Sequence, residues 1–165
     1  MRLIIQVKAT MIVESVRYNR VSGEYDALIF TEKAPASYSQ AYRGIKSIQD
    51  WVFPEGASTM SVEHRFARDL DAAGEVVVYA KLPRSFQIPT PVGNYAPDWA
   101  IAFATGSVKH VYFVAETKGS LSSLELRGVE STKIACARKL FNEMSGSDVR
   151  YEAVTSYEDL LNAVR

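Results

Sequence analysis

Three charged residues have the types and spacing needed for metal-dependent hydrolysis of a phosphodiester. A Pro-Asp pair places Asp98 in the alternating segment 95–103. A Glu-Thr-Lys motif places Glu116 and Lys118 at the end of the apolar run 111–118. Both segments are rich in β-branched and aromatic residues, which predicts two strands. Side chains alternate along a strand, so Glu116 and Lys118 share one face; if the strands pair as neighbours, Asp98 lies across from Glu116.

This group of charges suits Mg²⁺, which usually takes one or two carboxylates, several waters and phosphate oxygens of its substrate. Asp98 and Glu116 would supply the protein ligands. A bound metal activates water and stabilises the charge that develops on a phosphodiester. Lys118 would orient that water or contact the phosphate, and the sequence leaves both roles open. Taken alone the pattern is weak, because an acid and a lysine on a strand face are most often simply solvated.

The length and composition are typical of one globular domain. The chain has 165 residues, of which 47% are hydrophobic and 23% charged, and this balance argues against disorder. No apolar run approaches the roughly 20 residues of a membrane span, and no leader pattern is visible. The single cysteine excludes an internal disulfide and fits a reducing cytoplasm.

The charge balance bears on nucleic-acid binding. Nineteen basic and nineteen acidic residues give a net charge of zero. Affinity for duplex DNA comes largely from basic residues that displace counterions at phosphates. A net charge of zero therefore argues against a chain that binds DNA tightly by itself. It remains compatible with a nuclease module that other domains or subunits deliver to DNA.

The order of predicted elements gives an α/β fold. The first third is predicted to be β-rich, with a short helix at Ile45–Phe53. From residue 58 onward, helices and strands alternate around a proline-rich loop at 83–94. The predicted elements of this part are a helix at 61–73, strands at 75–82, 95–103 and 111–118, a helix at 124–144, a strand at 149–154 and a helix at 157–164.

Three further charges lie on predicted apolar helix faces. Glu63 falls inside the apolar arc of the first helix, and Glu130 and Lys133 fall inside the stripe of the long helix, whereas Thr132 points outward. In one interpretation, Glu130 and Lys133 form an i,i+3 ion pair, and Glu63 lies at a solvent-exposed edge of its helix. In the other, all three point into the cleft of Asp98. We favour the second interpretation, because one functional site then explains every charged residue on the predicted apolar helix faces.

Other reactive residue types have structural explanations. No Gly-x-Ser-x-Gly elbow is present, and Cys136 lies mid-helix near the edge of the apolar stripe, where we expect a small structural thiol. His64 and His110 lack metal-ligand spacing with any cysteine, and we expect both on the surface. Trp51 and Trp99 are expected to pack in the core or on a strand face.

Several longer motifs occur in unbroken order between residues 45 and 140. They are Val62-Glu63-His-Arg-Phe66, Lys81-Leu-Pro83, Thr90-Pro-Val-Gly93, Tyr95-Ala-Pro-Asp98, Tyr112-Phe-Val-Ala-Glu116-Thr-Lys118, Leu126-Arg127 and Lys133-Ile-Ala-Cys-Ala137. In this stretch the chain resembles the endonuclease domain at the C-terminal end of the restriction subunit of type III restriction enzymes.

The resemblance implies the PD-(D/E)xK nuclease fold, an α-β-β-β-α-β core with a central mixed sheet flanked by helices. Residues 58–165 would form this core, and residues 1–57 a β-rich extension packed on it. The resemblance also implies Mg²⁺ as the cofactor and assigns the site. The implied catalytic residues are Asp98, Glu116, Lys118 and Glu63; the metal ligands are Asp98, Glu116 and Thr117; Glu130 and Lys133 have a supporting role.

The resemblance also implies partners. These are duplex DNA, a helicase-like motor that uses ATP, and a DNA methyltransferase subunit, in a prokaryotic cytoplasm without membrane attachment. The chain contains no Gly-x-x-x-x-Gly-Lys-[Ser/Thr] phosphate loop, so it is expected to be a fragment or a separate nuclease subunit. Two alternatives remain open: a non-catalytic DNA-binding or subunit-bridging module of the same fold, and a related repair or recombination nuclease.

Overall fold

The computed structural model describes residues 41–54, 61–107, 112–117, 128–144 and 149–165. The β-rich segment predicted before residue 41 lies outside these ranges. Lys118 and His110 lie outside them too. For β3, the strand at Tyr112–Thr117, the backbone is described and the side chains are not.

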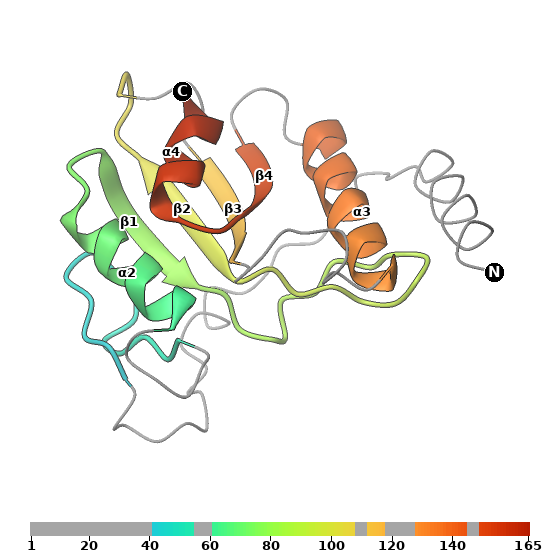
Figure 1. The fold of residues 1–165 in the computed structure, drawn as a ribbon, viewed down its shortest axis with the longest axis horizontal. Coiled ribbons are helices and arrows are strands. Elements are labelled where there is room, and N and C mark those ends of the chain that lie inside the picture. Colours follow the sequence, from blue (N-terminus) through green and yellow to red (C-terminus); the bar gives the residue numbers. More distant parts are fainter. Residues whose placement is uncertain (1–40, 55–60, 108–111, 118–127, 145–148) are drawn as a thin grey trace.

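A four-stranded mixed sheet forms the centre of the described chain (Figure 1). Its strands follow the order β1-β2-β3-β4, in which β1–β2 and β2–β3 are antiparallel and β3–β4 is parallel. The mixed sheet predicted from the sequence is therefore confirmed. The strands other than β3 are β1 (Val76–Lys81), β2 (Trp99–Phe103) and β4 (Val149–Val154).

The described residues form three helices beside the sheet, and together with the strands they give the expected order α-β-β-β-α-β followed by a terminal helix. Ser61 begins the first, because its side chain accepts a hydrogen bond from the His64 N–H. Ser156 begins the last in the same way, accepting from the Asp159 N–H. The helices are α2 (Val62–Ala72), α3 (Gly128–Met144) and α4 (Tyr157–Val164).

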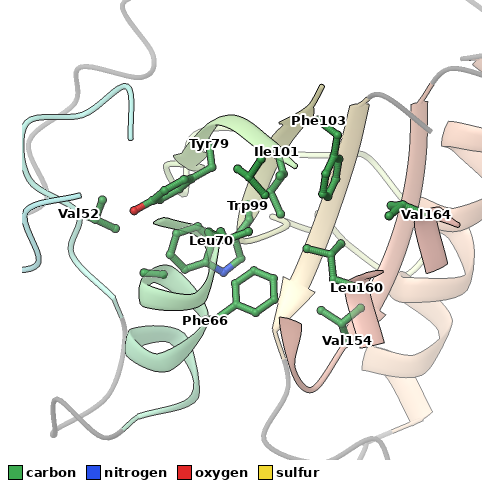
Figure 2. Close-up of a cluster of buried hydrophobic side chains, with 12 residues drawn as sticks. Val52, Phe66, Leu70, Tyr79, Trp99, Ile101, Phe103, Val154, Leu160 and Val164 are labelled. Atoms are coloured by element: carbon green, nitrogen blue, oxygen red, sulfur yellow. The ribbon is translucent and has the colours of Figure 1, made fainter. Parts of the chain in front are cut away.

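Two hydrophobic cores show that helices cover both faces of the sheet. On one face α2 and α4 pack on the sheet around Trp99, which is fully buried (Figure 2). On the other face α3 packs through Ile134 and Ala137 against Tyr151 of β4. Figure 1 shows α3 standing apart from α2 and α4. Each large apolar side chain buried this way contributes about 1.5–3 kcal/mol.

The buried face of α3 differs from the predicted stripe. Thr132 was expected outside and is 4% exposed, whereas the apolar Val129 of the same helix is exposed. Cys136 is fully buried, although its position near the edge of the predicted stripe did not specify this. The helix is therefore rotated toward its small residues, Thr132 and Cys136 among them, because small side chains let a helix approach a sheet closely.

The segment 41–54 forms no helix, so the helix predicted at Ile45–Phe53 is wrong. The chain instead runs along the outer edge of β1, where the Tyr79 N–H donates to the Lys46 carbonyl at 3.1 Å and the Ile48 N–H donates to the Tyr79 carbonyl at 3.0 Å. The unpaired backbone groups of an edge strand are strong partners, and here they outweigh a weak local helix preference.

One carboxylate of α2 holds this segment in place. Asp71 accepts hydrogen bonds from the Tyr42 hydroxyl at 2.5 Å and from the backbone N–H groups of Ile45 and Lys46. Burial acts to raise the pKa of Asp71, but these hydrogen bonds outweigh it and hold that pKa below its usual value. Burial, together with the Asp71 carboxylate, raises the pKa of Tyr42 to about 12.

Replacement of Asp71 by Asn should make the stability of the protein less dependent on pH. A lowered native pKa contributes stability above the unfolded pKa of about 4, and that contribution is lost as pH falls through the native pKa. Asp71→Asn should cost about 1–3 kcal/mol at pH 7, and the difference from wild type should shrink toward about pH 3. Urea unfolding across this range measures both. The exposed Asp69→Asn change on the same helix is the control, and equal pH profiles for Asp71→Asn and wild type would contradict the role of Asp71.

Candidate functional site

The register of β2 places the predicted acidic positions side by side. Trp99 pairs with Lys81 of β1 on one side and with Ala115 of β3 on the other. One residue further along the same antiparallel register, Asp98 stands opposite Glu116. The Leu82 N–H donates to the Asp98 carbonyl at 2.8 Å, which extends the β1–β2 ladder to this row. The backbone thus brings the two predicted acidic positions together at one end of the sheet.

A lysine joins two of the predicted acids. The Lys81 Nζ lies 3.0 Å from Glu63 Oε2 and 3.1 Å from Asp98 Oδ1. The side chains are 14% exposed for Lys81, 10% for Glu63 and 18% for Asp98. Glu63 of α2 therefore lies beside Asp98 around the Lys81 ammonium, and its role in the chemistry stays a prediction. Lys81 is the residue of this site to which sequence reasoning gave no role.

The facing carboxylates keep Lys81 charged. Burial acts to lower its pKa, but the Asp98 and Glu63 carboxylates outweigh burial, so the pKa of Lys81 is raised above its usual value. The Nζ also lies 5.0 Å from the centroid of the Trp99 ring, within the range of a cation–π contact. A buried charge is tolerated when it is paired and hydrogen-bonded in this way.

The backbone of Lys81 is fixed by a side-chain amide. Gln49 Nε2 donates to the Lys81 carbonyl at 2.6 Å, and the Lys81 N–H donates to Gln49 Oε1 at 3.1 Å. One amide side chain thus satisfies both backbone groups that the end of an edge strand leaves open. The segment beside β1 therefore fixes the backbone from which the Lys81 side chain extends.

Glu63 is positioned by the first turn of α2. Phe66, one turn further, packs against Trp99 with ring centroids 5.7 Å apart, which sets the helix against the start of β2. An acid in a first turn is also favoured by the helix dipole. The neighbouring His64 is 2% exposed, so the prediction of a surface histidine is wrong. The Tyr42 ring, whose hydroxyl donates to Asp71, lies edge-on to the His64 ring with centroids 6.5 Å apart.

The two charges of α3 that were predicted to support the site lie on the helix that packs on the other face of the sheet. Lys133 and Glu130 are both half-buried, and the Lys133 Nζ donates to the Asn94 carbonyl at 2.8 Å. Gly93, at φ 108°, lies under this ammonium, and a Cβ there would come within 3.5 Å of Nζ. Lys133 thus ties α3 to the loop that leads into Asp98. A role of Glu130 and Lys133 in the chemistry stays a prediction.

The described acids fit a hard divalent cation in part. Glu63 and Asp98 already direct one oxygen each at a single positive centre, and Mg²⁺ takes one or two carboxylates. Within the described ranges no group of three His, Cys, Asp or Glu side chains converges. The side chains of Glu116 and Thr117, the other predicted ligands, lie outside those ranges.

The comparisons with known proteins agree with this fold, a mixed sheet between helices of the restriction-endonuclease-like class. The chain belongs to the endonuclease domain family, whose pattern matches residues 49–157. It is 28% identical over 163 residues to the Res subunit of the type III restriction-modification enzyme EcoPI of Escherichia phage P1, and equally to that of EcoP15I of Escherichia coli. Each alignment covers 92% of this chain.

The chain spans 17% of the length of these two relatives. No solved structure matches. In the part of the chain that is described, no helix is long and apolar enough to cross a membrane.

Removal of the Gln49 amide should loosen the end of β1. Gln49→Ala leaves the N–H and C=O of Lys81 without their protein partners, which should cost about 1–2 kcal/mol of stability. Thermal and urea unfolding measure this loss. The exposed Gln87→Ala change is the matched control and should stay within about 0.5 kcal/mol of wild type. A Gln49→Ala protein as stable as wild type would show that water replaces the amide at no cost.

Proposed function

We propose that this endonuclease domain hydrolyses phosphodiester bonds of duplex DNA in a Mg²⁺-dependent reaction. The observation that carries the proposal is the convergence of Glu63 and Asp98 beside the register position of Glu116. Membership of the endonuclease domain family supports the reaction class. The cofactor follows from the donor set, because oxygen ligands from carboxylates suit a hard cation.

Each residue of the proposed site has a separate task. Asp98, Glu116 and Thr117 would hold the cation, which when bound activates water and stabilises charge on the scissile phosphate. Lys118 would orient the attacking water or contact the phosphate. Glu63 would act as an accessory acid, positioned by the first turn of α2.

The wider context is also part of the proposal. The two relatives are Res subunits of type III restriction-modification enzymes, and the chain corresponds to a small part of each. We infer that the domain cuts DNA within such an enzyme in a prokaryotic cytoplasm, together with an ATP-using motor and a methyltransferase subunit. The 165 residues contain no P-loop motif, which fits a motor located elsewhere.

Substitution of the proposed catalytic residues should remove activity without unfolding the protein. Asp98→Asn, Glu116→Gln and Lys118→Met should each lower Mg²⁺-dependent cleavage of duplex DNA by at least about 100-fold, because each removes a charge that the transition state needs. Circular dichroism and the melting temperature check the fold. Glu143→Gln, an exposed acid of α3, is the control and should cleave normally. Cleavage near the wild-type rate by any of the three variants would remove that residue from the site.

Binding to DNA by the isolated chain should be weak and sensitive to salt. With a net charge of zero, few phosphates can be neutralised, so affinity should be low and independent of sequence. Fluorescence anisotropy at about 50 and 200 mM salt, with duplexes of different sequence, measures this. Nanomolar binding to one particular sequence would show instead that these 165 residues carry DNA recognition themselves.

A further inference from the structure

The position of the Lys81 ammonium is unusual for a simple structural ion pair. It lies between two of the acids that the proposed function assigns to the site, 3.0 Å from an oxygen of Glu63 and 3.1 Å from an oxygen of Asp98. These two acids come from different elements, α2 and the residue before β2, and Lys81 is the cation on which they converge. A positive charge of the protein therefore stands between Asp98, a proposed metal ligand, and Glu63, the proposed accessory acid.

The attachment of Lys81 allows its two ends to behave differently. The backbone is fixed by the Gln49 amide and by the pairing with Trp99. The ammonium, by contrast, ends a flexible four-carbon stem with three rotatable donors. The side chain can thus turn away from the carboxylates while β1 stays in place.

We propose that Lys81 is a built-in counter-ion that a divalent cation must displace from Glu63 and Asp98. This inference rests on the proposed function, which makes Asp98 a metal ligand with Glu63 beside it as an accessory acid. Lys81 offsets one of the two negative charges before the metal arrives and so holds Glu63 and Asp98 together. It also lowers metal affinity, because binding must separate the ammonium from its carboxylates and bring two cations near each other.

Bound DNA would remove the penalty that Lys81 places on metal binding. A displaced ammonium needs another anion close to the site, and a phosphate of bound DNA supplies one. Metal binding would then be weak in the free protein and stronger in the complex with DNA. By linkage, DNA would in turn bind more tightly when the metal is present. Lys81 would thus act as a positioning residue that couples metal occupancy to the presence of substrate.

The test is a measurement of metal binding without DNA. Isothermal titration of the full chain with Mn²⁺, and melting temperatures with and without Ca²⁺, are compared for wild type and Lys81→Met. Lys81→Met should bind Mn²⁺ at least about tenfold more tightly, because the competing charge is gone. Its melting temperature should fall without metal, since Glu63 and Asp98 then repel each other, and Ca²⁺ should raise it more than in wild type.

Further variants keep the inference falsifiable. Lys81→Gln keeps hydrogen-bonding capacity without charge, and it replaces Lys81→Met in the same titration if the methionine variant fails to fold. Adding Asp98→Asn to either variant should abolish the gain in metal affinity. Lys46→Met is the matched control, because Lys46 donates to the Ala73 carbonyl at the opposite end of α2 from Glu63. Its metal response should equal that of wild type.

The outcomes separate the inference from the proposed function. Tighter Mn²⁺ binding after loss of the lysine charge, dependent on Asp98, supports the inference. Equal or weaker Mn²⁺ binding by both Lys81 variants overturns it and makes Lys81 a structural partner of the acids. In that event, Asp98-dependent cleavage by the wild-type protein with Mg²⁺ would leave the proposed function standing, and its absence would overturn both.

Discussion

The register of β2 with its two neighbours is the constraint on which the rest of the molecule depends. Trp99 pairs with Lys81 of β1 on one side and with Ala115 of β3 on the other. This row of three paired residues determines which residues of the three strands lie side by side at the end of the sheet. A slip of one residue would turn every side chain of β2 to the opposite face. Asp98 would then leave the position opposite Glu116. The fold thus specifies the site through backbone pairing before any side chain makes contact.

The hydrophobic core and the cluster of charged side chains share residues at this row. Trp99 is fully buried against Phe66 and Tyr79, and it also lies beneath the Lys81 ammonium. The α2 face that packs on Trp99 carries Glu63 one turn before Phe66. The same helix packing that excludes water from the core therefore sets the distance between the acids. A change in core volume here would be felt at the charged site, because densely packed interiors transmit displacement.

Sequence reasoning predicted the parts of the fold that depend on local patterns. The strands and helices after residue 61, their order and the mixed sheet follow from periodicity and from the family resemblance. The approach of Asp98 to the Glu116 position required one assumption, that neighbouring strands pair. Lys81 and His64 could not be placed in the same way. Their surroundings come from residues distant in the chain, such as Gln49 and Tyr42, and no local period reports such contacts. The alternation of side chains along a strand could have indicated only that Lys81 points to the same face of the sheet as Tyr79, two residues earlier.

The segment that runs beside β1 has a consequence for how far this domain can be shortened at its N-terminal side. Gln49 and the backbone around Ile48 occupy the outer edge of β1, and Val52 reaches the main core with 1% of its surface exposed. A version that starts near residue 58 would keep every strand of the sheet but leave that edge bare. Bare edges pair with other chains, so such a trimmed domain would self-associate in solution. A cut made before Tyr42 keeps the edge covered and also preserves the hydrogen bond to Asp71.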